Sequence, residues 1–159
     1  MKSLFFGGIH PADRKELSAN AELVSVMNPK EVTIPMLQHI GNPCTPLVAV
    51  GDHVKKGQKI GDGEGLCVPV HASVSGKVTA VEPRRHPNGR DILSVVIEND
   101  FQDEADTAMT AHKDYSALSD DEMIDIIREA GIVGMGGATF ATNIKAVSSM
   151  QKVDTLIAN

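Results

Sequence analysis

Four glycines crowd into a short stretch near the end of the chain, at Gly131, Gly134, Gly136 and Gly137. Glycine has no Cβ atom, so such a cluster suits a backbone that bends through positive φ or that a ligand approaches closely. When the turn leads into a helix, the free N–H groups and the helix dipole favour a phosphate or another anion. We therefore expect this turn to belong to a flavin or nicotinamide nucleotide site.

A second interpretation of the glycines needs no ligand. They could form a plain turn between two helices, with Gly131 as the C′ residue that ends the first helix. One glycine-rich turn is a weak motif, so the residues alone leave both interpretations open.

The helix expected before the glycines has a clear beginning and end. Ser119 can cap it, Glu122 can complete a capping box, and the acidic first turn suits the helix dipole. Apolar residues then recur at helical spacing, at Met123, Ile124, Ile126, Ile127 and Ala130. The pattern predicts a helix that ends at Gly131.

Weaker signals follow the glycines. Residues 141–150 predict a second helix, for which Thr139 or Thr142 could supply the N-cap, and residues 153–158 predict a strand. No partner for that strand occurs in the roughly forty residues before it. We expect residues 119–159 to be the truncated start of an α/β domain that binds a nucleotide.

Between residues 47 and 99 the sequence predicts short strands separated by glycine turns. Residues 74–82 alternate with a period of about two, as a half-buried strand requires, and Pro83 is expected to end them. The Asn-Gly pair within residues 86–89 is a strong hairpin signal. Residues 91–99 are the longest β-branched run and predict a strand. Many short strands at this spacing indicate a compact β-barrel or sandwich.

The first part of the chain is interrupted by prolines. Residues 7–46 contain five, which exclude helix interiors and central strands, so we expect an extended segment that lies across other structure, with one short strand near residues 31–34. The opening G-G-I-H-P is either an arm packed close to a partner domain or a simple surface turn. His10 and His39 have no neighbouring ligand residues and are expected to be hydrogen-bonded packing histidines.

Residues 101–118 are polar and acidic and are expected to be a linker. The predicted organisation is then an arm and a β-rich domain in residues 1–100, the linker, and the α/β segment in residues 119–159.

Composition excludes several classes of partner. The 159 residues carry a net charge of −6, which argues against a nucleic-acid surface. No apolar run approaches the roughly 20 residues that a membrane span needs, and the first residues are too short for a secretory signal, so a cytoplasmic location is expected. Cys44 and Cys67 are the only cysteines and form no C-x-x-C pair. We predict two reduced thiols and no zinc or iron–sulfur ligand set.

Two stretches resemble the barrel-sandwich hybrid of biotinyl and lipoyl carrier domains. They are V-G-D-x-V-K-K-G-Q-x-I from Val50 and H-A-S-V-S-G-x-V from His71. In carriers a modified lysine lies at the tip of the hairpin between these halves. The matching tip, residues 62–69, contains no lysine, and Lys59 and Lys77 lie on the wrong side of the turns. We expect the barrel to be a scaffold; a carrier domain is the alternative.

The whole pattern resembles the C subunit of the Rnf (Rsx) electron-transport complex. Its elements are F-x-G-G-I-H-P near the start, the barrel without its lysine, and E-A-G-I-V-G-M-G-G-A-T-F from Glu129. The chain matches only the N-terminal part of that subunit. The resemblance implies electron transfer between NADH and ferredoxin through FMN and iron–sulfur clusters, coupled to ion translocation. The clusters would belong to the remaining part of the subunit, and sister subunits would hold it at the cytoplasmic side of the membrane.

The glycine turn is also similar to G-x-G-G-A-G-F-P-T-G-x-K of the NADH- and FMN-binding subunit of respiratory complex I. This similarity implies cofactor-binding residues at Gly134, Gly136, Gly137, Ala138, Thr139, Phe140 and Lys145, with Thr142 also matching. The glycines would let the loop approach the flavin and nicotinamide, and Lys145 would offer an ammonium to a phosphate. Thr139, Ala141 and Asn143 depart from the pattern, and Ala141 lacks the proline that would preset the first helical turn. No catalytic acid or base is expected, because the cofactor supplies the chemistry.

Scaffolding is the competing role for the chain. In that interpretation the barrel docks against sister subunits and has no chemistry of its own.

Overall fold

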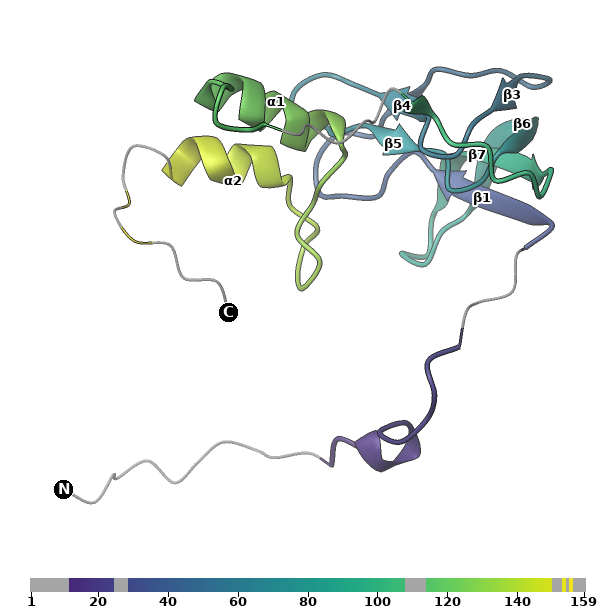
Figure 1. Cartoon of the computed structure of the whole chain (residues 1–159). Helices are drawn as coiled ribbons and strands as arrows, with labels where there is room; N and C mark the ends of the chain where they lie inside the picture. Colours follow the sequence, from purple (N-terminus) through teal and green to yellow (C-terminus); the bar gives the residue numbers. More distant parts are fainter. Residues whose placement is uncertain (1–11, 25–28, 108–113, 150–152, 154, 156–159) are drawn as a thin grey trace.

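The computed structural model describes residues 12–24, 29–107, 114–149, 153 and 155. Two antiparallel sheets form the body, and two helices lie beside it (Figure 1). The larger sheet has the strand order β1-β7-β6-β3 and the smaller one β2-β4-β5. The strands are β1 (Glu31–Pro35), β2 (Thr45–Pro46), β3 (His53–Val54), β4 (Lys59–Asp62), β5 (Val70–His71), β6 (Gly76–Arg85) and β7 (Asp91–Asn99).

Strand β7 is the centre of the larger sheet. It pairs with β1 on one side and with β6 on the other, and Val95, Val96 and Ile97 are fully buried. Three consecutive buried residues mean that both faces of the strand are covered, as a run of β-branched residues allows. The predicted strands at residues 31–34 and 91–99 and the hairpin turn between β6 and β7 are confirmed.

Pro83 does not end β6, contrary to the prediction. The strand continues to Arg85, and Pro83 lies opposite Leu93 of β7. The Leu93 carbonyl accepts a hydrogen bond from the Met36 N–H on the β1 side at 2.8 Å, so it does not point at β6. The Pro83–Leu93 pair therefore exchanges no hydrogen bond, and the N–H that proline lacks is not needed there.

A β-bulge in β6 also changes the predicted alternation. The register with β7 shifts between Val78 and Ala80. A strict alternation would put Val81 on the same face as the polar residues. Because it follows the shift, Val81 packs against the core instead. A bulge adds one residue to one strand and so exchanges its two faces.

One hydrophobic core lies between the two sheets. It consists of Ile34, Met36, Cys44, Val54, Ile60, Cys67, Val70, Ala72, Val78, Val95 and Ile97. Aliphatic side chains and sulfur atoms fill it, which agrees with a chain that has few aromatic residues. The tip between β4 and β5 belongs to this core, because Cys67 and Val68 are each only 2% exposed.

The helices are α1 (Asp120–Glu129) and α2 (Thr142–Ser149), and they contact each other. The capping box predicted for α1 is confirmed: the Ser119 hydroxyl accepts from the Glu122 N–H, and the Glu122 carboxylate accepts from the Ser119 N–H. The caps predicted for the second helix are wrong. Thr142 is already its first residue, and the Thr139 hydroxyl donates to the neighbouring Ala138 carbonyl.

Residues 101–106, the first part of the expected linker, lie along the barrel together with Asp100 before them. Lys56 donates its N–H to the Glu104 carbonyl and accepts from the Asp106 N–H, and its ammonium pairs with Asp103. The Ser75 hydroxyl donates to Asp100 at 2.7 Å. Most of the strand expected at residues 153–158, and the opening G-G-I-H-P with His10, fall outside the described residues.

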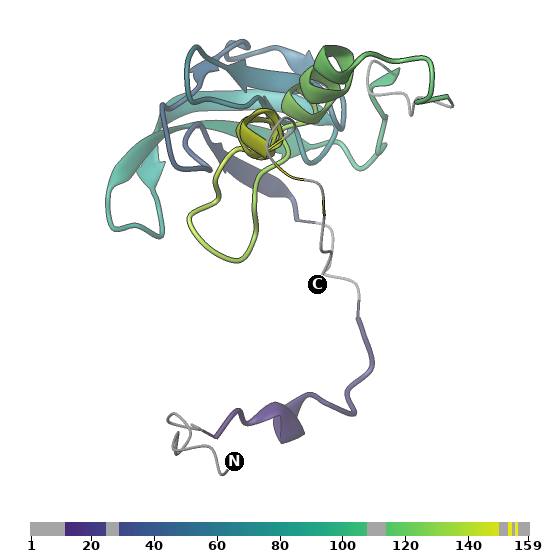
Figure 2. The same cartoon turned by 90° about the vertical axis from the view of Figure 1, so that its left-hand side faces the viewer.

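The described part of the N-terminal arm, residues 12–24, contains η1 (Lys15–Leu17) and stands away from the sheets (Figures 1 and 2). It does not cross other structure there, contrary to the prediction. Leu17, Leu23 and Val24 are largely exposed, so no apolar contact holds these residues to the body.

Among the described residues, no helix has both the length and the apolar composition needed to cross a bilayer.

Candidate functional site

Residues 134–140 form a loop, here called the glycine loop, that projects below the two helices in Figure 1. Its base is closed by an antiparallel bridge between Val133 and Ala141 and by a hydrogen bond from the Gly134 N–H to the Phe140 carbonyl at 2.9 Å. Ala141 is fully buried and anchors the return of the chain into α2. The closed base presents the residues between Gly134 and Phe140 as one projecting unit.

Gly131 ends the first helix with φ +68°, as the ligand-free interpretation proposed for this position. A Cβ atom here would lie 2.5 Å from the Pro69 carbonyl oxygen and 3.3 Å from the His71 ring. Gly131 is therefore needed both for its conformation and for the close packing of α1 on the barrel.

Gly136 and Gly137 differ from Gly131. Neither has a φ between +20° and +160°, and a Cβ atom at either would have no other atom within 4 Å. Neither conformation nor internal packing requires glycine at these two positions. Their bare backbone is open to a molecule that approaches the loop.

Lys145 folds back from α2 over the glycine loop. Its ammonium nitrogen lies 5.9 Å from the centroid of the Phe140 ring and 2.6 Å from the point that a Cβ atom of Gly134 would occupy. Lys145, Phe140 and Gly134, which the sequence predicted as site residues, are therefore neighbours. A lysine positive charge beside a loop of this kind is suited to an anion.

The start of α2 has an unusual polar atom. The oxygen Oδ1 of Asn143 is buried and has no hydrogen-bond partner within the described part of the chain. Buried polar atoms are nearly always paired, so an orphan one calls for an explanation, such as a ligand or water.

A cavity of about 340 Å³ adjoins the glycine loop. Its walls come from the loop, from the segment after β1 and from the β6–β7 turn, and consist of Leu37, Gln38, His39, Ile40, His86, Asn88, Ala138 and Thr139. Figures 1 and 2 both show the hairpin tip beside the loop. Of the predicted site residues, Ala138 and Thr139 line this cavity.

A second cavity of about 540 Å³ continues the first, because Gln38 and His86 line both. It extends along β1 and the β6–β7 turn. Both are open to solvent, so they are surface grooves and not enclosed cavities.

Ion pairs hold the end of α1 on the barrel. Arg128 bridges to Asp62 of β4 at 2.7 Å, and Lys59 pairs with both Asp62 and Glu129. Burial disfavours the Asp62 carboxylate, but the Gly63 N–H, Arg128 and Lys59 outweigh burial and lower its pKa. Lys59, chiefly through its hydrogen bond, likewise lowers the pKa of Glu129.

His71 lies beneath this ion-pair network. Burial, followed by the charge of Lys59, lowers its pKa and so favours the neutral ring. The network fixes the base from which the glycine loop projects.

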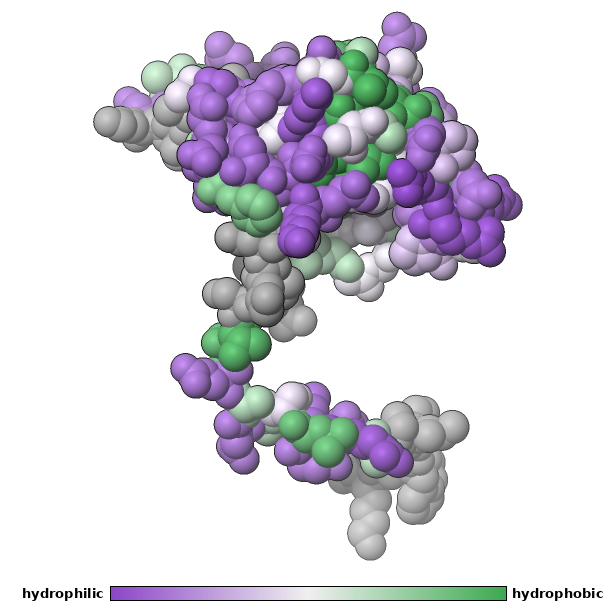
Figure 3. Space-filling model, turned by 90° about the vertical axis from the view of Figure 1, so that its right-hand side faces the viewer, coloured by the Kyte–Doolittle hydropathy of each residue, from purple (hydrophilic) through white to green (hydrophobic). Residues whose placement is uncertain are grey.

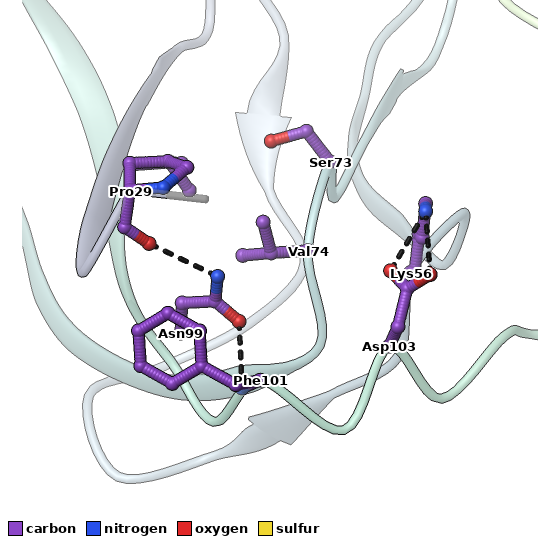
Figure 4. A pocket seen from close by; sticks show the side chains of 8 residues that line it. Pro29, Lys56, Ser73, Val74, Asn99, Phe101 and Asp103 are labelled. Carbon is purple, nitrogen blue, oxygen red and sulfur yellow. Dashed lines mark hydrogen bonds and ion pairs between the residues drawn. The ribbon is translucent and has the colours of Figure 1, made fainter. Parts of the chain in front are cut away.

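A separate cavity of about 330 Å³ has none of the predicted site residues (Figure 4). Its lining includes Val74, Asn99 and Phe101, and the Asn99 side chain donates to the Pro29 carbonyl at 3.0 Å. Its lysine, Lys56, is paired with Asp103.

Three residues that the sequence treated separately meet in the barrel. His39, Cys44 and Cys67 are all buried, and their ligand atoms lie within 4.8 Å of one another. The two thiols are free, as predicted, with 3.2 Å between the sulfur atoms. Burial and the neighbouring thiol raise the pKa of Cys44 to about 12. His39 accepts a hydrogen bond from the Val68 N–H, as expected of a packing histidine.

No motif in the sequence indicated this cluster. The residues are separated in sequence, and the pairing of β2 with β4, together with the hydrogen bond from the Asn42 N–H to the Leu66 carbonyl, brings the two cysteines together. The sequence did contain one indication of a crowded site: Gly61 and Gly63 lack the Cβ atoms that would lie against the sulfur atoms of Met36 and Cys67.

Comparison with known protein families identifies the family to which this architecture belongs. Residues 3–102 match the family model described as the RnfC barrel sandwich hybrid domain. The chain belongs to the RnfC family. The two-sheet body is thus a barrel-sandwich hybrid, and the resemblance to the C subunit of the Rnf complex is confirmed. The glycine loop lies beyond the matched residues.

Curated relatives of the family align with nearly the whole chain. The C subunit of the Na⁺-translocating ferredoxin:NAD⁺ oxidoreductase complex of Acetobacterium woodii is 47% identical over 98% of this chain. Its proton-translocating counterpart of Clostridium ljungdahlii is 43% identical over 100% of it. The C subunit of an ion-translocating oxidoreductase complex of Pectobacterium atrosepticum is 39% identical over 98%. The chain spans 35%, 35% and 22% of these relatives' lengths.

Proposed function

We propose that the chain is part of an Rnf-type C subunit, in which the glycine loop contributes to a site for FMN and NADH and the barrel is its scaffold. The observation that carries the proposal is the open backbone at Gly136 and Gly137, beside a cavity that Ala138 and Thr139 line. Its relatives are named as ferredoxin:NAD⁺ oxidoreductase subunits, which suits a redox cofactor at this loop.

The residues present fit a nucleotide in two respects. A flat ring can lie against the bare backbone of the loop, and Lys145 supplies positive charge for a phosphate. When bound, FMN supplies the hydride and electron chemistry. The chain's own residues bind and orient it, and none of them needs to exchange a proton.

In this proposal residues 119–159 begin a nucleotide-binding α/β domain. Its cofactor site would be completed by chain that the relatives have beyond the aligned part, as would the iron–sulfur clusters. Sister subunits are the proposed partners, and they would hold the protein at the cytoplasmic face of the membrane.

Lys145 gives the direct test. The remaining part of the Acetobacterium woodii relative is fused after Asn159, and FMN and NADH are titrated into the fusion protein. We expect Lys145→Ala to weaken FMN or NADH binding by about 10-fold to 100-fold, because a hydrogen bond to a charged group contributes roughly 1.5–3 kcal/mol.

Lys77→Ala is the matched control, because Lys77 is an exposed lysine on β6 outside the cavities that the loop lines or adjoins. It should leave both affinities unchanged. Equal affinities for the Lys145→Ala protein and the unaltered fusion would remove Lys145 from the site. A fusion protein that binds neither FMN nor NADH would contradict the nucleotide proposal as a whole.

A scaffold role without a cofactor is the second candidate. It is favoured by the exposed apolar residues Leu17, Leu23 and Val24 of the arm and by the hydrophobic patch that Figure 3 shows on one face. Exposed apolar surface of this kind is typical of docking surfaces. The Lys145→Ala comparison in the same titration separates the candidates, since a pure scaffold would leave the affinities of the fusion protein unchanged by this substitution.

A further inference from the structure

His39, Cys44 and Cys67 come from three different segments and meet inside the barrel. His39 follows β1, Cys44 precedes β2, and Cys67 lies in the tip between β4 and β5. Their exposed fractions are 6%, 4% and 2%. One imidazole nitrogen and two sulfur atoms within 4.8 Å of one another, shielded from water, form a compact set of soft ligands.

Hydrogen bonds fix the form of the imidazole. Its Nδ1 lies 3.2 Å from the Ile40 carbonyl oxygen, and its Nε2 lies 3.2 Å from the Val68 nitrogen. Only the neutral ring with the proton on Nδ1 satisfies both contacts, so the lone pair is on Nε2. A metal-binding histidine has this arrangement, in which one nitrogen donates to a carbonyl and the other keeps its lone pair.

The imidazole Nε2 and both thiols are directed at the backbone of Val68. The Cys44 thiol donates to the Val68 carbonyl at 3.2 Å, and Cys67 precedes Val68 in the chain. The Val68 N–H bond to Nε2, at 3.2 Å, is at the long end of the usual range, and thiols are weak donors. A cation would replace these bonds with stronger ones.

Glycines keep the space around the sulfur atoms clear. A Cβ atom at position 63 would lie 3.0 Å from Cys67 Sγ. At position 61 it would lie 2.6 Å from the sulfur of Met36 and 3.2 Å from Cys44 Cβ. Met36 is fully buried, so a thioether sulfur accompanies the two thiols.

We propose that His39, Cys44 and Cys67 bind one thiophilic d¹⁰ cation, Zn²⁺ or Cu⁺, as a structural site. Thiolate, thioether and imidazole ligands select these ions over Mg²⁺ or Ca²⁺. In a tetrahedral zinc site with Zn–S bonds of about 2.3 Å, two sulfur atoms are about 3.8 Å apart, so the present 3.2 Å requires only a small separation. Binding releases the thiol protons to solvent and changes no oxidation state.

The ion has a route to the site. His39 also lines the cavity beside the glycine loop, so one ligand borders open space while both thiols are buried. The bound ion would join the segment after β1 to the tip between β4 and β5. It would therefore hold fixed one wall of that cavity.

The test uses the 159-residue chain, reduced and without oxygen. Zn²⁺ and Cu⁺ are each titrated against a competing chromophoric chelator, and Co²⁺ serves as a spectroscopic substitute for Zn²⁺. We expect one ion per chain, a thiolate-to-cobalt charge-transfer band, and a higher melting temperature with the ion bound. Absence of the band together with no binding of either Zn²⁺ or Cu⁺ would overturn the proposal.

Variants assign the ligands. Cys44→Ser, Cys67→Ser and His39→Gln should each weaken binding at least about 10-fold to 100-fold, the range seen when even an outer-shell partner is lost. His86→Gln is the control, because His86 lines the same cavity as His39 and is outside the cluster. Unchanged affinity in the three ligand variants would assign the ion elsewhere and refute the site.

A further measurement needs no variant and so does not depend on how the variants fold. Alkylation of both cysteines in the unaltered chain is followed with and without Zn²⁺. We expect the ion to slow the modification of both thiols together, with Mg²⁺ as the control. Equal rates with Zn²⁺ and Mg²⁺ would contradict the proposal.

Discussion

The barrel and the helical segment are stabilised in different ways. The barrel has its own core, in which Val54, Ile60, Val78 and Ile97 are completely buried. Helix α1 has no buried residue, and its apolar face is only half covered. The barrel therefore has the core that a folding unit of its own would need, whereas the helices depend on what they contact.

The helices contact the barrel through a few specific interactions. The Asp62–Arg128 ion pair and the close approach of Gly131 to Pro69 join the two regions. The glycine loop, which we propose to hold a cofactor, is thus attached to the barrel by its base. The comparison predicts that the two regions respond separately to substitutions.

The largest effect is expected in the barrel core. Ile97→Ala removes a fully buried side chain from the central strand and should lower the free energy of unfolding by about 2–5 kcal/mol. Ile127→Ala, the same change on the half-buried face of α1, should cost about 1 kcal/mol. Urea denaturation measures both. Equal losses would break the distinction between the two regions.

A medium effect is expected where the regions meet. Gly131→Ala places a side chain at φ +68° and a Cβ atom 2.5 Å from the Pro69 carbonyl oxygen. We expect a cost of about 1–3 kcal/mol, confined to the attachment of α1. Hydrogen exchange should become faster in residues 120–129 and stay unchanged in β7.

Gly136→Ala is the matched control for this substitution. Its Cβ atom would meet nothing within 4 Å, and its φ is outside the left-handed region, so stability should be unaffected. Faster exchange throughout the barrel in the Gly131→Ala protein would show that the helices and barrel form one cooperative unit.

The smallest effect is expected from pH. Asp62 and Glu129 have lowered pKa values, so their contribution is complete above the ordinary carboxyl pKa and is lost as pH falls through the folded-state values. The lowered pKa of His71 acts in the same direction, beginning below its ordinary value of 6.5. These pairs are partly exposed, so the sum should be about 1 kcal/mol or less.

Amide chemical shifts of residues 120–129, recorded against pH, measure this loosening of α1. Asp62→Asn combined with Glu129→Gln should remove the part of the response that falls in the carboxyl range. A response that persists in the double variant would assign the loosening to other groups.

The sequence predicted local features well. The β-branched run at residues 91–99 forms β7, and Ser119 with Glu122 forms the capping box, because both patterns depend on neighbouring residues. Features set by distant partners were not predictable. Pro83 continues β6 only because Leu93 points its carbonyl toward β1.

The candidate site shows the same division. The glycine pattern located the loop, but the cavity beside it is built from the segment after β1 and the β6–β7 turn, which no local pattern connects to the loop. The neighbourhood of His39, Cys44 and Cys67 likewise follows from strand pairing and loop hydrogen bonds between segments that are distant in sequence.

The proline within β6 has a consequence for assembly. Among the described strands, β3 pairs with β6 only at Gly76 and Lys77, so the outer side of residues 79–85 is a bare sheet margin. The unpaired N–H and C=O groups of such a sheet edge can pair with a strand of a second molecule. Pro83 has no N–H to donate there, and Glu82, Arg84 and Arg85 surround it with charge. Pro83 and these charges therefore disfavour the addition of a strand from another molecule along this edge of the hairpin.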